Sequence, residues 1–101
     1  MKTSIFRKIN SQGRINLTKD FCDFVGINPK DKVALCKGKN GDELYILSID
    51  KVKANEIIAF SKVDIKYRIV IPKFLVEKSD YLFEMFIFER KIVLKSKTTT
   101  K

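Results

Sequence analysis

The chain has no histidine and no tryptophan, and its 101 residues include two cysteines, two prolines and four glycines. Without histidine, and with Cys22 and Cys36 as its two thiols, the sequence lacks the four soft ligands of a structural zinc site. Both cysteines stand among apolar neighbours, so we expect buried free thiols rather than a disulfide. We therefore predict neither a metal nor a cofactor.

The missing histidine also removes the side chain that most often acts as a general base. There is no glycine-rich phosphate loop and no nucleophile elbow, and the carboxylates are scattered among lysines without an evident pair. Cys22 falls on an apolar helix face with no base nearby to activate it. We therefore expect that the protein is not an enzyme.

Long apolar runs are absent as well. No run reaches the ~18 residues needed to span a bilayer. The opening stretch "MKTSIFRKINSQ" lacks the apolar centre of a signal peptide. These absences predict a cytoplasmic protein.

Basic residues are abundant. The chain has twenty-one Lys and Arg and twelve Asp and Glu, which gives a formal net charge of +9. Residues 1–50 carry 9 basic and 6 acidic side chains (+3), and residues 51–101 carry 12 and 6 (+6). This excess favours a polyanionic partner, most simply double-stranded DNA, although lysine-rich surfaces also serve solubility. With 45% apolar residues, the chain is also able to build a folded core.

In the first half, alternation of side chains predicts strands at 4–9, 14–17, 32–37 and 43–49. Between them, "KDFCDFV" (19–25) is predicted as a short helix that Thr18 caps and Gly26 ends. Asn40-Gly41 predicts a hairpin turn between the last two strands.

The phrase "KINSQGRINLTK" (8–19) recurs as "KVDIKYRIVIPK" (62–73) at a constant offset of 54. Both copies keep an arginine, Arg14 and Arg68, four residues after an Asn or Asp. "KFLVEK" then predicts a short helix, and "DYLFEMFIFERKIVLK" a hairpin that turns at "ERK". Because residues 81–88 are apolar at almost every position, we expect that strand to be buried on both faces.

The recurrence divides the chain into a first unit at 1–50, a linker or short helix at 51–61, a second unit at 62–96 and a frayed tail at 97–101. Each unit is too small to bury a core alone. We therefore expect the two units to intertwine around one barrel-like core with pseudo-twofold symmetry.

At these residues the chain resembles the SpoVT–AbrB family of swapped-hairpin DNA-binding domains. "FRKINSQGRINL" carries the family's basic strand and Gly-Arg, and "VDIKYRIVIPK" carries its Asp, Arg, apolar strand and Pro. Two copies in one chain are similar to the arrangement in the MraZ branch. The resemblance implies a mainly β fold with short helices, built from two tandem AbrB-like swapped-hairpin β-barrel repeats. It also implies sequence-specific binding of duplex DNA and transcriptional regulation.

The chain departs from the family pattern in both units. The first unit has Asn10 in place of Asp and Thr18 in place of Pro, and the second has Tyr67 where glycine is expected. The helix "KDFCDFV" carries Asp20 and Asp23 where several family members carry basic residues. A DNA-binding mode that depends on basic residues in this helix is therefore not expected of the first unit.

The arginines are the leading candidates for DNA contact. In each strand two apolar side chains point inward, so the period of two directs the arginine outward. Its planar fork suits guanine or phosphate, but Asp64 or Asn10 could instead hold it as a brace of the turn. The full set of predicted DNA-binding residues is Arg7, Lys8, Arg14, Lys19, Lys62, Lys66, Arg68 and Lys73.

Two further questions stay open at this stage. One alternative function is an antitoxin-like module that neutralises a toxin protein, and another is a duplicated scaffold that has lost binding. The repeats can close within one chain or be exchanged in a homodimer. Residues 81–88 and "NEIIAF" (55–60) offer apolar surface for such a dimer.

Overall fold

The computed structural model describes residues 4–38, 43–75 and 82–97. They form a mainly β fold, as the sequence predicts, with one α-helix, α1 (Lys19–Val25). The strands are β1 (Ser4–Lys8), β2 (Arg14–Asn16), β3 (Lys32–Lys37), β4 (Glu43–Ser48), β5 (Ala59–Lys62), β6 (Arg68–Val70), β7 (Leu82–Phe88) and β8 (Lys91–Ser96). None of the helices in these ranges is long and apolar enough to cross a membrane.

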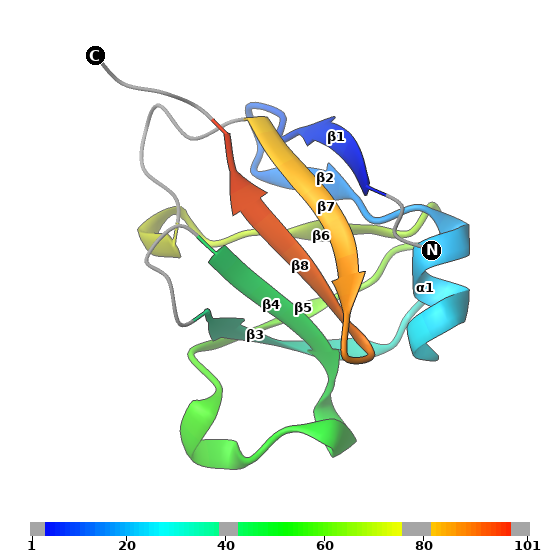
Figure 1. The fold of residues 1–101 in the computed structure, drawn as a ribbon, viewed down its shortest axis with the longest axis vertical. Helices are drawn as coiled ribbons and strands as arrows, with labels where there is room; N and C mark the ends of the chain where they lie inside the picture. The colour runs from blue at the N-terminus through cyan, green and yellow to red at the C-terminus, as the bar shows by residue number, and fades with distance from the viewer. Residues whose placement is uncertain (1–3, 39–42, 76–81, 98–101) are drawn as a thin grey trace.

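Six strands form one antiparallel sheet in the order β1-β7-β8-β4-β3-β5 (Figure 1). Two hairpins, β3–β4 and β7–β8, make up its centre. The β7–β8 turn lies at "ERK", as predicted, with positive φ at Glu89 (52°) and Arg90 (65°), the backbone of a tight hairpin. The predicted Asn40-Gly41 turn lies outside the described residues.

The outer strands of this sheet are exchanged between the two halves of the chain. β1 pairs with β7 of the second half, where Ser4 lies opposite Phe86. β5 pairs with β3 of the first half, where Lys32 lies opposite Lys62. Each half therefore completes the sheet of the other, and the strand order is the same from both ends when each strand is replaced by its counterpart.

The short strands β2 and β6 pair with each other and form a separate two-stranded ribbon. Ile15 and Ile69 lie opposite each other in it, and both are buried in the core. The same core cluster contains Ile46 and Leu94 from the central strands of the sheet. In Figure 1, β6 passes behind β7 and β8. The core therefore lies between the ribbon and the central strands of the sheet. At the edge of the sheet the ribbon adjoins β5, where the Val70 N–H donates to the Ser61 hydroxyl at 3.1 Å.

The predicted helix and its ends are confirmed. The Thr18 hydroxyl accepts a hydrogen bond from the Phe21 N–H (3.3 Å), and Gly26 ends α1 with φ 81°. Phe21, Cys22 and Val25 form its buried face. In the second half, "KFLVEK" begins with a 3₁₀ turn, η3 (Lys73–Leu75), and its remaining residues lie outside the described ranges.

Two predictions of local structure need correction. The segment 51–61 is not a single helix or a plain linker, because η1 (Ile49–Lys51), η2 (Ala54–Glu56) and the start of β5 occupy it. Residues 81–88 are not buried on both faces. Within β7, Phe83 and Met85 are buried but Phe88 is 49% exposed, because the described elements place no covering layer over that end of the strand's outer face. Of the predicted tail, Lys97 alone is described.

Candidate nucleic-acid interface

Two equivalent turns lead into the ribbon. In the first, the Asn10 side-chain oxygen accepts hydrogen bonds from the backbone N–H groups of Gln12 and Arg14, both at 2.9 Å. In the second, Asp64 accepts from Lys66 and Arg68, also at 2.9 Å. The repeated phrase is therefore repeated structure, in which an Asx oxygen holds each turn.

The ribbon is closed by a matched pair of backbone hydrogen bonds between the two halves. The Leu17 N–H donates to the Tyr67 carbonyl, and the Ile71 N–H donates to the Gly13 carbonyl, both at 2.7 Å. Both acceptor residues have positive φ, 81° for Gly13 and 62° for Tyr67. Tyr67 thus takes the left-handed backbone that favours glycine, at the position where the first half has Gly13.

The ribbon places the two arginines on one face. Arg14 lies opposite Val70, and Arg68 lies opposite Asn16, so the arginines are diagonal neighbours across the strand pair. Such neighbours are about 7–8 Å apart. Since Ile15 and Ile69 point into the core, this face points outward. The arginines, 54 residues apart in sequence, thus belong to one small surface, which we call the arginine ribbon (Arg14, Asn16, Arg68 and Val70).

The two arginines differ in their restraint. The Arg68 Nε donates to the Asp64 carboxylate at 2.8 Å, and these side chains are 37% and 34% exposed. Arg14 instead donates to the neutral side-chain oxygen of Gln12. Asn10 does hydrogen-bond Arg14, through the Arg14 backbone N–H, and as an amide it leaves the charge of Arg14 unneutralised. Arg68 is therefore braced by a charge, and Arg14 is not.

The hydrogen bonds around Asp64 stabilise its ionised form. Partial burial raises the pKa of Asp64, but the hydrogen bonds from the Arg68 and Lys66 backbones and from the Arg68 side chain outweigh that effect. Its pKa consequently lies below the ordinary value of 3.8. At neutral pH Asp64 is ionised and cancels part of the positive charge of Arg68.

Strands β1 and β5 lead into the two turns and end in Lys8 and Lys62, which are exposed. Arg7 lies on the opposite side of β1 and is half-buried, and its Nε is buried with no hydrogen-bond partner among the described residues. Lys8 and Lys62 are thus exposed where the two strands enter the turns, and Arg7 is turned inward.

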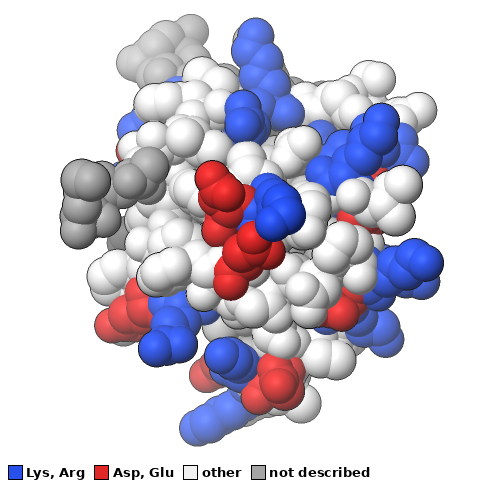
Figure 2. Space-filling model, turned by 90° about the vertical axis from the view of Figure 1, so that its right-hand side faces the viewer, with Lys and Arg blue, Asp and Glu red and all other residues white. Residues whose placement is uncertain are grey.

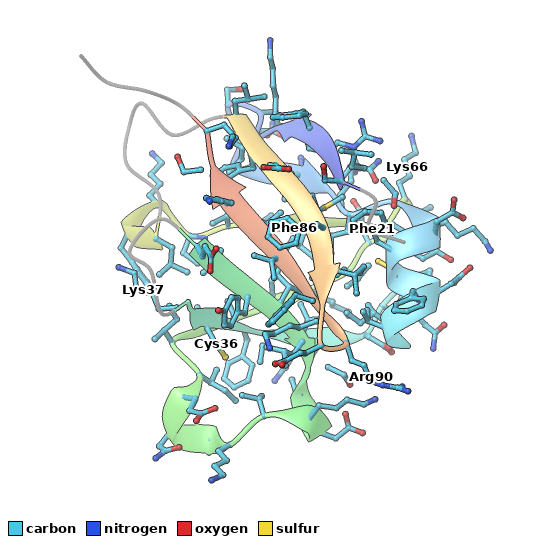
Figure 3. All side chains as sticks on the ribbon, viewed as in Figure 1. Phe21, Cys36, Lys37, Lys66, Phe86 and Arg90 are labelled. Atoms are coloured by element: carbon cyan, nitrogen blue, oxygen red, sulfur yellow. The ribbon has the colours of Figure 1, made fainter. Side chains whose placement is uncertain are left out.

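The remaining predicted lysines differ in their surroundings. Lys19 donates to Asp23 at 2.9 Å, and this contact raises the pKa of Lys19. Lys66 is exposed in the second turn and lies beside the start of α1 (Figure 3). Lys73 is exposed at the start of η3. Lys66 and Lys73 are thus exposed beside the second turn and after β6, whereas Lys19 is engaged within its own helix.

The face that carries α1 has mixed charge. Basic side chains lie along its upper and right-hand edges, and carboxylates lie beside basic groups in the centre and below (Figure 2). This agrees with the acidic residues of α1 and with its internal ion pair. The helix face is consequently a weaker candidate for a polyanion than the arginine ribbon.

Two members of the arginine ribbon were not among the predicted site residues. Asn16 and Val70 lie on its outward face and are exposed. The alternation of side chains in "RIN" and "RIV" indicates their outward direction, because in a strand a residue two positions from the arginine lies on the same face. Gln12 was missed as the partner of Arg14, because a two-residue side-chain contact across a turn has no sequence signature.

The thiols are unsuited to chemistry. Cys22 and Cys36 are free and buried, and burial raises the pKa of Cys22 to about 12. Within 4–38, 43–75 and 82–97, no three Cys, Asp or Glu side chains are grouped to hold a metal ion. No protein-family model matches the chain, and no curated protein matches it either.

Proposed function

We propose that this chain binds duplex DNA sequence-specifically and regulates transcription in the manner of the AbrB-type proteins that it resembles. In this proposal its architecture is two tandem swapped-hairpin repeats closed into one barrel. The exchange of β1 and β5 between the halves supports that architecture, as does the strand order that is the same from both ends. The proposed protein is a binding protein and not an enzyme.

The observation that carries the proposal is the diagonal pairing of Arg14 and Arg68 on the arginine ribbon. Two arginines whose backbone positions are diagonal neighbours, about 7–8 Å apart, can reach neighbouring base edges or phosphates of one duplex. The exposed Lys8 and Lys62 lie at the ends of the strands that enter the two turns, where they suit backbone contacts. Arg14 has no acidic partner among the described residues, so it is the better candidate for base contact.

The test begins by selecting bound duplexes from a random-sequence pool and measuring affinity by gel shift at graded salt. If five phosphates are contacted, log K falls with log salt at a slope near −4.5. The variant Arg14→Ala/Arg68→Ala should lose at least roughly thirtyfold in affinity for the selected duplex, since each bidentate base contact contributes about 1–3 kcal/mol.

The matched control is Lys53→Ala/Arg90→Ala, which removes the same charge from exposed positions in the segment 49–58 and the β7–β8 turn. It should lower affinity much less. A folded Arg14/Arg68 variant that binds like the wild type would remove the arginine ribbon from the proposal. A wild-type protein that selects no duplex would refute DNA binding and favour the toxin-neutralising alternative.

A further inference from the structure

The outward face of the arginine ribbon is the same in the two halves at the arginines and different beside them. A local twofold axis at the centre of the strand pair relates Arg14 to Arg68 and Asn16 to Val70. Both Asn16 and Val70 are exposed, but Asn16 is polar and Val70 is apolar. Arg14 therefore has a valine opposite it, and Arg68 has an asparagine.

The second half is also more apolar at two other exposed positions near the ribbon. The first half has a polar or acidic residue at each, and the second half has a large apolar one: Ser11 corresponds to Ile65, and Asp20 to Phe74. Ile65 and Phe74 are 70% and 71% exposed. Gathered exposed apolar side chains mark interaction sites in soluble proteins. The difference at Val70 thus belongs to a wider difference between the halves.

The Val70 side chain is held beside Arg14. The two residues lie directly opposite each other, which places their Cβ atoms about 4.5–5.5 Å apart. The Val70 N–H donates to the Ser61 hydroxyl at 3.1 Å, which ties this end of β6 to β5. Val70 Cγ1 lies 3.7 Å from the position that a Cβ on Gly13 would take, so the isopropyl group adjoins the first turn. Because a β-branched side chain has few rotamers, Val70 loses little side-chain entropy on binding.

The counterpart of Val70 offers different chemistry. The Asn16 side-chain oxygen accepts a hydrogen bond from the Thr18 backbone N–H at 2.7 Å, which leaves the amide N–H groups to donate. In the major groove, donors find acceptors on adenine, guanine and thymine alike. The apolar group displayed there is the C5-methyl of thymine. Asn16 therefore discriminates weakly among these bases, whereas Val70 matches thymine.

We propose that Val70 reads the C5-methyl group of a thymine next to the base pair that Arg14 contacts, so that the two halves read unequal half-sites. The proposed reading rests on the proposed DNA binding and adds the base that distinguishes the halves. The major groove admits a two-stranded ribbon, and adjacent base pairs are about 3.4 Å apart, so side chains opposite each other in the ribbon suit neighbouring base pairs. A protein is a poorer partner for Val70, because the other residues of this face are two arginines and an asparagine.

The first test replaces each thymine of the selected duplex in turn with deoxyuridine, which removes the C5-methyl and keeps the hydrogen-bonding groups. In gel shifts the wild type should lose about fourfold in affinity at one thymine, the effect of exposing one methyl group. Val70→Asn copies the residue of the first half and should bind thymine and deoxyuridine equally at that position. The matched control is Ile58→Asn, at a residue that is 40% exposed outside the ribbon, and it should keep the fourfold difference.

The second test repeats the duplex selection with variants that make the two halves alike. Val70→Asn should select a site without the distinguishing thymine, and Asn16→Val should select thymine on both sides of the axis. Thermal unfolding of each variant checks that the fold is intact.

The outcomes separate the two proposals. A wild type that binds a duplex at which no thymine is sensitive to loss of its methyl group would overturn the reading by Val70 and leave DNA binding standing. An unchanged site in both variants would overturn it as well and would point to a protein partner for the apolar residues. A wild type that selects no duplex would refute DNA binding itself.

Discussion

The two turns that lead into the arginine ribbon have the same backbone and different charges. Asn10 and Asp64 accept the same pair of backbone hydrogen bonds at the same distance. The turn therefore requires an oxygen at this position and not a charge. The charge of Asp64 has a separate effect, which is to hold the Arg68 side chain. Equivalent turns thus present Arg68 with a carboxylate partner and Arg14 without one among the described residues.

The largest loss of stability is expected from substitutions in the core of the ribbon, where the two halves are most alike. Ile15 and Ile69 are paired and each is 1% exposed, so replacement by alanine leaves equivalent cavities. Each variant should lose about 2–5 kcal/mol of unfolding free energy, measured by urea denaturation. The two losses should agree within about 2 kcal/mol, the spread found for one substitution at different buried sites. A loss confined to one site would show that the halves are not energetically equivalent.

A smaller loss of stability is expected from a substitution at Gly13, the residue with left-handed backbone in the first turn. In Gly13→Ala the new Cβ would lie 3.1 Å from the Ile71 carbonyl oxygen, on a residue with φ 81°. We expect a loss of about 1–2 kcal/mol in urea denaturation, because the left-handed conformation is costly for a residue with a side chain. Tyr67 already accepts this conformation in the second half and packs its ring against the core. Unchanged stability of Gly13→Ala would mean that the first turn is able to relax.

The smallest effect concerns the charge that distinguishes the turns. Because the folded-state pKa of Asp64 lies below the ordinary value of 3.8, its ionised form stabilises the fold above that pH. This stability is lost as the pH falls below 3.8 toward the folded-state pKa. Asp64→Asn should abolish that contribution, which is under about 1 kcal/mol for a pair exposed by a third.

The measurement for Asp64→Asn is urea denaturation at pH 7 and pH 3, with Asn10→Asp as the reciprocal variant. We expect a smaller loss on acidification in Asp64→Asn than in wild type and a larger loss in Asn10→Asp. In the gel shift, Asp64→Asn should also tighten DNA binding by a few fold, because it releases Arg68. Equal acid sensitivity of both variants and wild type would show that the Asp64 charge does not act on stability.

Local structure was predictable where one segment determines it. The strands 32–37 and 43–48 follow from alternation, and Thr18 with Gly26 delimits α1. The alternation in both copies of the phrase likewise predicted that Arg14 and Arg68 point outward, and the pairing of β2 with β6 brings them onto one face. Each of these features depends on residues that are close in sequence, or on two copies of one phrase.

Features that depend on distant contacts were not predictable. β5 was missed because Ala59 and Ser61, at its inward positions, do not give a strong apolar alternation. The partner of each outer strand is set by assembly of the whole six-stranded sheet, which no local pattern records. The burial of β7 was misjudged because apolar composition does not reveal whether another layer covers a strand. The braced state of Arg68 was foreseen as an alternative, since Asp64 was within reach.

The exchange of outer strands has a consequence for synthesis of the protein. β1 emerges first from the ribosome, yet its partner β7 lies about eighty residues later, with Ser4 opposite Phe86. At about 5–20 residues per second, β1 therefore waits several seconds for its partner. During that interval its strand edge is unpaired, and Ile5, which packs against the core in the folded chain, is unprotected. We therefore expect folding to be largely post-translational, and the nascent chain to be more prone to aggregation than the finished protein.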